Sequence, residues 1–166
     1  MIIFFDFDDT LFDREKFISA LTKELGISQE EFLKDYNRHF KDRGRPYSLK
    51  KHLEFLGGSR RERGLDHFFR DLSAFVYPES YQLLQESRRQ ADKLILLSYG
   101  DEEMQSKKIR GSGLTEYFDK IIVTSDKAES LKEWYSEKER IIFINDKSEE
   151  NERIKNLFPG LEIIKI

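Results

Sequence analysis

Three aspartates follow a short apolar run at the start of the chain, which begins MIIFFDFDDTLFD. Asp6, Asp8 and Asp9 come directly after residues 2–5. Carboxylates this close together repel one another, and removing any of them from water is costly. A buried strand that ends in such a cluster therefore predicts a ligand or a reaction that needs carboxylates. The alternative is an aspartate-rich turn after an edge strand, because Asp is a common turn residue.

Polar residues also end two later apolar runs. Residues 94–97 are followed by Ser98, and residues 141–144 by the pair Asn145-Asp146. Ligands of an open parallel sheet bind beyond the carboxyl ends of its strands, so these residues and the first aspartates converge if their strands are neighbours. Hard oxygen ligands in a chain without cysteine indicate Mg²⁺. Such a cation would also lower the cost of holding the acids together.

The elements that would position these residues alternate between strands and helices. Continuous apolar runs are typical of parallel strands that are covered on both faces. They lie at residues 2–5, 94–97, 121–123, 141–144 and 161–166. Helical spacing of apolar residues appears between them, at residues 80–91 and 127–137. This alternation predicts an α/β fold with a doubly wound parallel sheet.

A long helical stretch interrupts the alternation after the first strand. Apolar spacing predicts one helix that ends at Gly26 and another that begins after Ser28 in a capping box, with two more to follow. Residues 14–77 are therefore predicted to form an inserted helical cap. The core domain is predicted to comprise residues 1–13 and 78–166.

Composition limits the kinds of site and partner. A chain of 166 residues and 19.9 kDa suits one domain with an insertion. It has no cysteine, which excludes disulfides and thiolate metal sites. The net charge of -3 gives no indication of nucleic-acid or anionic-membrane binding, and no run is long enough to span a membrane. With no charged leader before the apolar start, we expect a cytoplasmic protein that is a monomer or a weak dimer.

The ordered set of motifs resembles the haloacid dehalogenase (HAD) superfamily. The motifs follow the family's order: Asp6-Phe7-Asp8-Asp9-Thr10 as the first, Ser98 as the second, Lys127 as the third, and Asn145-Asp146 with Glu150 or Asn151 as the fourth. The resemblance covers nearly the whole chain. It implies a Rossmann-like doubly wound sheet, the HAD fold, with an α-helical C1 cap of the phosphoglycolate phosphatase and β-phosphoglucomutase type.

The resemblance implies catalytic roles for four residues. Asp6 would be the nucleophile that forms an aspartyl-phosphate. Asp8 would protonate the leaving oxygen and later deprotonate the attacking water. Ser98 would bind the phosphate oxygens, and Lys127 would balance charge on the transferring group.

The resemblance also implies a set of Mg²⁺ ligands. Asp6, the backbone carbonyl of Asp8, and Asp146 would hold the cation, which would shield the dianionic phosphate from the anionic nucleophile. Glu150 would be a further ligand, while neutral Asn151 occupies the other slot of the fourth motif. This motif departs from the family's usual Gly-Asp or Asp-Asp, and Glu150 is longer than the acid expected there. The fourth motif is therefore where a weakened site would arise.

Three functions fit these residues. The first is a Mg²⁺-dependent phosphatase that acts on a small phosphorylated metabolite. Asp8 argues against the dehalogenase branch, which lacks an acid at that position. The second is a phosphomutase of the same family, for which no residue speaks directly. The third is a HAD-like binding or regulatory protein with weakened catalysis, which the unusual fourth motif would explain.

Several of these residues also have a purely structural interpretation. Asp9 is expected to be an acceptor at a turn or helix start, Thr10 could cap the turn, and Lys127 could be a solvated helix lysine. The histidines, interpreted as surface or packing residues, are His39, His52 and His67. A basic run of the cap could contact substrate or could be a solvated helix start; it contains Arg60, Arg61 and Arg63.

Overall fold

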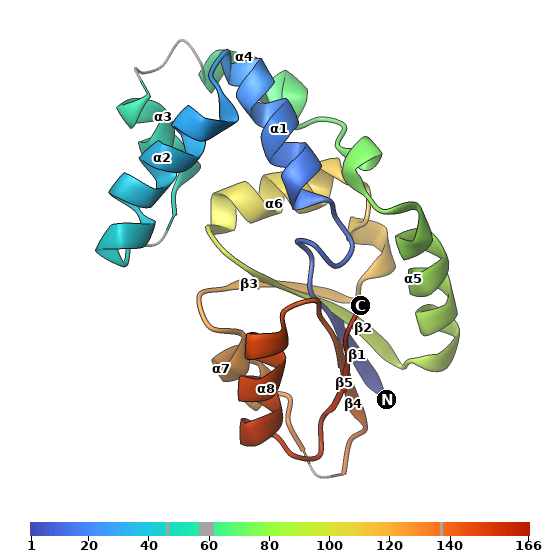
Figure 1. The fold of residues 1–166 in the computed structure, drawn as a ribbon. Helices are drawn as coiled ribbons and strands as arrows, with labels where there is room; N and C mark the ends of the chain where they lie inside the picture. The colour runs from blue at the N-terminus through green and yellow to red at the C-terminus, as the bar shows by residue number, and fades with distance from the viewer. Residues whose placement is uncertain (46, 57–61, 137) are drawn as a thin grey trace.

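A computed structural model describes residues 1–45, 47–56, 62–136 and 138–166. Five parallel strands form one sheet in the order β3-β2-β1-β4-β5 (Figure 1). The strands are β1 (Ile2–Phe5), β2 (Lys93–Tyr99), β3 (Lys120–Thr124), β4 (Ile141–Ile144) and β5 (Glu162–Ile164). The predicted α/β fold with a parallel sheet is therefore confirmed.

The first strand lies at the centre of this sheet. Phe5 at its end is in register with Leu96 of β2 and with Ile144 of β4. Asp6 after β1 and Asn145-Asp146 after β4 consequently lie side by side, next to Ser98 near the end of β2. This is the adjacency on which their predicted convergence depends.

Alternate residues of each strand face two separate hydrophobic layers. Ile3 and Phe5 pack on the layer that includes α5 (Pro78–Gln90) and α6 (Glu102–Gly111), whereas Ile2 and Phe4 pack on α7 (Lys127–Lys132) and α8 (Ser148–Leu157). Burial on both faces explains why the strands are continuously apolar. The helix predicted to reach residue 137 ends earlier, because the chain turns to pack the Trp134 ring edge-on against Phe4, with ring centroids 5.9 Å apart.

The cap contains the four predicted helices in the part of the chain that the structure describes. They are α1 (Arg14–Leu25), α2 (Gln29–His39), α3 (Leu49–Phe55) and α4 (Glu62–Phe68), with 3-10 turns at Lys41–Arg43 and Ser73–Phe75. Gly26 ends α1 with a φ of 66°, and the Ser28 hydroxyl accepts from the Glu31 amide to begin α2. After α4 ends at Phe68, the Leu72 amide donates to the Gly111 carbonyl at 2.7 Å.

The base of the cap is packed against the core. One hydrophobic cluster contains Phe17 of α1, Leu72 and Ile109 of α6. A Cβ added at Gly111 would lie 2.3 Å from the Phe69 carbonyl oxygen, so the end of α6 needs glycine for this close approach. The α2–α3 limb instead extends away from the sheet (Figure 1). The proposed division at residues 13/14 and 77/78 stays a prediction, and the cluster shows that packing crosses it.

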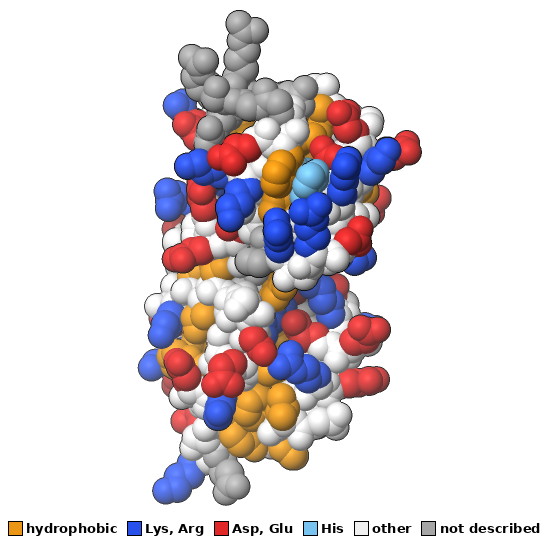
Figure 2. All heavy atoms as spheres, turned by 90° about the vertical axis from the view of Figure 1, so that its left-hand side faces the viewer, with side chains coloured by type: hydrophobic (Ala, Val, Ile, Leu, Met, Phe, Trp, Pro, Cys, Tyr) orange, Lys and Arg blue, Asp and Glu red, His pale blue; other side chains and the backbone are white. Residues whose placement is uncertain are grey.

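The outer face of the cap is strongly charged. Figure 2 shows Lys and Arg side chains spread across it, and a mixture of hydrophobic, acidic and basic side chains where cap and core meet. Among the described residues, no helix is both long enough and apolar enough to cross a membrane.

Candidate active site

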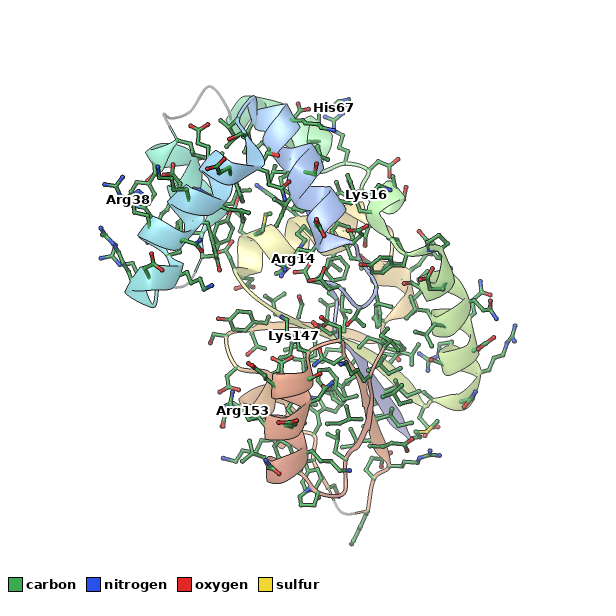
Figure 3. All side chains as sticks on the ribbon, in the orientation of Figure 1. Arg14, Lys16, Arg38, His67, Lys147 and Arg153 are labelled. Atoms are coloured by element: carbon green, nitrogen blue, oxygen red, sulfur yellow. The ribbon has the colours of Figure 1, made fainter. Side chains whose placement is uncertain are left out.

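A cavity of about 290 Å³ lies beyond the carboxyl end of the sheet, beneath the cap. Asp6, Asp8 and residues of α6 line it from the core, and residues of α1 and α2 line it from the cap. Arg14 on the cap side and Lys147 on the core side also line it, and Figure 3 shows them on opposite sides of this space. The cavity is thus the place where the predicted catalytic aspartates meet the cap.

Asp6 is buried with one carboxylate oxygen engaged and the other free. Its Oδ1 accepts from the Phe7 amide at 2.7 Å and lies 2.9 Å from Lys127 Nζ. Its Oδ2 is buried and has no hydrogen-bond partner among the described residues. Burial raises the pKa of Asp6 to about 6, although the Lys127 ammonium acts in the opposite direction. An unpartnered, buried carboxylate oxygen is suited to bind a cation or to attack a substrate.

Lys127 holds Asp6 from the start of α7. The Asp126 carboxylate caps this helix by accepting from the Ala128 amide. The Lys127 side chain is 1% exposed, and its Nζ lies 2.9 Å from Asp6 Oδ1 and 2.7 Å from Glu150 Oε2. Interpretation as a solvated helix lysine is therefore wrong. The ammonium is the fixed positive charge between two carboxylates.

The two acid slots of the fourth motif differ in their contacts. Glu150 pairs with Lys127, and its Oε2 also accepts from Asn145 Nδ2 at 3.1 Å. Asn151 is buried and exchanges hydrogen bonds with Asn145, receiving one at 2.8 Å from the side chain and donating one at 3.1 Å to the carbonyl. Glu150 thus reaches Asp6 through the lysine, and its role as a metal ligand stays a prediction. Asn151 and Asn145 fix the loop after β4.

Asp8 points toward α6, where two side chains hold its carboxylate. Lys108 Nζ donates to Asp8 Oδ1, and Gln105 Nε2 donates to Asp8 Oδ2 at 2.8 Å. The Gln105 amide also donates to the Tyr99 carbonyl at 2.8 Å, which ties the group to the end of β2. Asp8 therefore lies at the cavity wall in a defined orientation.

Ser98 lies within β2, in register with Val123 of β3, and not after the strand as predicted. Its hydroxyl is buried and has no partner among the described residues, and Ser98 is not one of the residues that line the cavity, so its contact with phosphate stays a prediction. Thr10 Oγ1 accepts from the Asp146 amide at 3.2 Å and lies 3.4 Å from Asp146 Oδ1. Thr10 thereby joins the loop after β1 to the loop after β4.

Asp9 has the structural role predicted for it. Its φ is 62°, a left-handed conformation that Asp tolerates better than most residues. Its carboxylate accepts from Arg14 Nε at 2.8 Å. Asp9 therefore lies in the turn that leads from β1 into the cap. Its side chain contacts α1 through Arg14.

The donors at this site fit a magnesium ion. Three acidic or histidine side chains close enough to form a metal site by themselves do not occur in the described ranges. Mg²⁺ needs fewer, because it is commonly bound by one or two carboxylates with waters and substrate oxygens. The free Asp6 Oδ2, the Asp146 carboxylate and the Asp8 carbonyl would hold it. The unpartnered Oδ2 of Asp6 is the observation that supports this fit.

Of the three cap arginines, only Arg63 lies among the residues that the structure describes. Arg60 and Arg61 lie outside the described residues. Arg63 belongs to α4, which packs against α1. Their predicted contact with substrate stays a prediction.

Two residues of the site, Gln105 and Lys108, are absent from the sequence-based candidates. Both are buried on α6, where Met104 and Ile109 belong to the same core-facing side. The signal in the sequence is a polar pair at positions that a core-facing helix normally fills with apolar side chains. This pattern indicates that Gln105 and Lys108 each have a buried polar partner. It does not indicate that the partner is Asp8.

Comparisons with known structures agree with the fold. A haloacid dehalogenase-like hydrolase from Burkholderia xenovorans is 21% identical, with a TM-score of 0.75 over 99% of this chain and 80% of that one. L-2-haloacid dehalogenase from Xanthobacter autotrophicus is 18% identical, with a TM-score of 0.64 over 99% of this chain and 76% of that one. The HAD hydrolase YfnB from Bacillus subtilis, bound to magnesium, is 18% identical with a TM-score of 0.59, over 99% and 86% of the two chains.

Comparisons of sequence show the family. Phosphoserine phosphatase from Thermus thermophilus is 35% identical over 77 residues, which are 45% of this chain and 31% of that enzyme. The match thus spans about a third of the length of that relative. The sequence profile of the haloacid dehalogenase-like hydrolases matches residues 1–144. With the sheet order, the cap and the site geometry described above, the chain belongs to the haloacid dehalogenase-like hydrolase family.

Proposed function

We propose that this hydrolase is a Mg²⁺-dependent phosphatase that acts on a small phosphorylated metabolite through an aspartyl-phosphate at Asp6. The observation that carries the proposal is the Asp6 carboxylate, buried with Oδ1 held by Lys127 and Oδ2 unpartnered at the cavity. Asp8, two residues later, lines the same cavity and supplies the second acid that phosphoryl transfer to and from a carboxylate needs.

The first step would form a bond between an Asp6 oxygen and phosphorus while the bond to the leaving oxygen breaks. The leaving oxygen would take a proton from Asp8. Ser98 would donate to a phosphate oxygen, since its hydroxyl is buried without a partner. Bound Mg²⁺ would offset the negative charge that otherwise keeps the carboxylate and the phosphate apart.

The second step would regenerate the enzyme with water. Asp8 would take a proton from the water as its oxygen bonds to phosphorus and the bond from phosphorus to Asp6 breaks. Inorganic phosphate leaves, and both aspartates return to their starting protonation. Lys127 would stay next to Asp6 throughout, because Glu150 contacts its Nζ from the other side.

The walls of the cavity favour a compact organic leaving group with apolar surface. Ile18 and Leu21 of α1 and Leu33 of α2 line the cap side, together with the rings of Tyr36 and Tyr47. A volume of about 290 Å³ is at the small end for ligand pockets. The phosphate ester of an amino acid, which the name of the Thermus relative indicates, has a suitable size, but its leaving group is charged and does not match these apolar walls.

Phosphate release by the purified chain tests the proposal. We expect Mg²⁺-dependent turnover of p-nitrophenyl phosphate and of at least one small metabolite ester, lost with a chelator. Asp6→Asn should remove it, whereas Asp9→Asn should retain it, because Asn accepts the left-handed conformation that Asp9 adopts. Absence of phosphate release from every ester, or full activity in Asp6→Asn, would contradict the proposal.

A further inference from the structure

Lys108 is a buried cation that the proposed reaction does not use. It lies on α6 with its side chain 4% exposed, and its Nζ donates to Asp8 Oδ1. The Nζ also lies 5.3–5.4 Å from the ring centroids of Phe7, Phe12 and Phe17, within range of a cation–π interaction. The ammonium therefore occupies a box of three aromatic rings next to the Asp8 carboxylate.

Such a placement is costly to the fold. Burying an ammonium and a carboxylate together removes hydration that their attraction recovers only in part, and apolar residues of similar size are often as good or better for stability. Burial lowers the pKa of Lys108, although Asp8 acts in the opposite direction. A lysine here is consequently better explained by what it does to Asp8 than by its contribution to folding.

Gln105, one turn earlier on α6, completes the arrangement. Its Nε2 donates to Asp8 Oδ2 and to the Tyr99 carbonyl, both at 2.8 Å. Each oxygen of Asp8 thus receives one hydrogen bond from α6 and has a second lone pair available. The carboxyl group can therefore accept or give a proton on its cavity side without leaving these partners.

We propose that Lys108 and Gln105 are positioning residues that fix the carboxyl plane of Asp8 toward the leaving group of the substrate. This inference rests on the proposed phosphatase function. General acid catalysis requires the acid within hydrogen-bond reach of the leaving oxygen in a productive orientation, so a freely rotating Asp8 would protonate it less often. Lys108 is assigned this role through its contact with the Asp8 carboxylate.

The matched pair of variants is Lys108→Met and Lys107→Met. Methionine fills the aromatic box without the charge, and Asp8 keeps its Gln105 hydrogen bond at the cavity, so Lys108→Met should lower the midpoint of thermal unfolding less than Lys127→Met does. Lys107 is the next residue on α6 and pairs with Glu103 at 2.8 Å, away from Asp8. It controls for the loss of a lysine from this helix. Gln105→Leu removes the hydrogen bond to the other Asp8 oxygen, Oδ2, and so tests the same positioning. It replaces Lys108→Met as the test variant if that protein fails to fold.

The readout is the dependence of kcat/KM on the leaving group. Phenyl phosphate and p-nitrophenyl phosphate are similar in shape, but phenolate needs protonation more than nitrophenolate does. We expect Lys108→Met to lose on the order of tenfold more kcat/KM with phenyl phosphate than with p-nitrophenyl phosphate, a part of the hundredfold or more that a general acid contributes. Lys107→Met should behave as the wild type with both.

A double-mutant cycle separates positioning from a general structural effect. In an Asp8→Asn background, Lys108→Met should cause little further loss, because the group that it positions is already gone. Equal losses with both esters, no loss at all, or a full additional loss in Asp8→Asn would overturn the inference. A wild-type enzyme that hydrolyses neither ester would contradict the proposed function itself, which distinguishes the two failures.

Discussion

The two lysines of the site meet their aspartates in different surroundings. Lys127 comes from α7 and lies between two carboxylates, those of Asp6 and Glu150. Lys108 comes from α6 and lies between one carboxylate, that of Asp8, and three phenylalanine rings. The first lysine supplies positive charge to buried Asp6 and half-buried Glu150, whereas the second fixes the orientation of one acid at the cavity wall.

This difference separates what each pair does for stability from what it does for catalysis. Removing Lys127 would leave Asp6 and Glu150 facing each other without a counter-charge. Removing Lys108 would leave Asp8 with its Gln105 hydrogen bond and an open side toward the cavity. The Lys127 pair is therefore expected to support both the fold and the reaction, and the Lys108 pair mainly the reaction.

The largest expected effect is at the nucleophile. Asp6→Asn keeps the shape of the side chain but gives a poor nucleophile, so turnover should fall by at least about a thousandfold with any ester, whatever its leaving group. Asp8→Asn should instead cause a loss that grows with the basicity of the leaving group. Steady-state kinetics with a series of aryl phosphates would distinguish the two. Equal leaving-group dependence in Asp6→Asn and Asp8→Asn would show that the two aspartates do not have the different roles proposed for them.

The next effect concerns the counter-charge at Asp6. Lys127→Met should lower kcat/KM by about a hundredfold with both phenyl and p-nitrophenyl phosphate and lower the free energy of unfolding by about 3 kcal/mol, because it leaves the buried Asp6 carboxylate unpaired. Lys132→Met, on the same helix but exposed, is the control. A Lys127→Met protein as stable as Lys108→Met would show that the two pairs do not differ as proposed.

A smaller effect is expected on metal affinity. Asp146→Ala should raise the Mg²⁺ concentration for half-maximal activity by about tenfold or more, since a ligand is lost. Lys108→Met should leave that concentration unchanged, because Lys108 contacts the carboxylate of Asp8 and not its carbonyl. Titration of activity with Mg²⁺ checks both. An unchanged requirement in Asp146→Ala would mean that Asp146 is not a ligand.

The smallest effect concerns His52, a buried base of the cap. Its Nε2 has no partner among the described residues and its ring lies 4.4 Å from that of Phe32. Burial lowers the pKa of His52 to about 4, with nearby Asp35 opposing. Because the unfolded chain takes up the proton near its ordinary pKa of about 6.5, stability should decrease as pH falls from there toward 4, by about 1–2 kcal/mol at pH ~5.

The His52→Leu variant isolates this contribution. The difference between wild type and variant in free energy of unfolding should change between pH 7 and pH 5, while activity at pH 7 stays the same. Denaturant titrations at the two pH values measure it. A difference that is independent of pH would mean that the folded cap accepts the proton at His52 as readily as water does.

The sequence was sufficient for the sheet and for the residues at the strand ends. Continuous apolar runs followed by Asp6, Ser98 and Asp146 indicate parallel strands and their shared edge, and the structure places β1 between β2 and β4. Lys127 was identified only through the family resemblance, because spacing alone does not distinguish a buried lysine from a solvated one. Its contact with Glu150 depends on the packing of α7 beside α8, which no local pattern encodes.

The contacts of Gln105 and Lys108 with Asp8 could not be predicted from the sequence, for a different physical reason. Gln105 and Lys108 reach Asp8 because α6 packs over the turn that follows β1, with the cap base above it. That placement is set by long-range packing around Phe7, Phe12 and Phe17. A polar residue on a core-facing helix side indicates a buried partner, but its identity follows only once the elements are assembled.

Trapping the covalent intermediate tests the central claim most directly. Wild-type protein with Mg²⁺ and p-nitrophenyl phosphate would be quenched in acid during turnover, digested and analysed by mass spectrometry. One added phosphoryl group is expected on the peptide that contains Asp6, located at Asp6 and absent in Asp6→Asn. Turnover without a phosphorylated residue, or with the phosphoryl group on another residue, would contradict it.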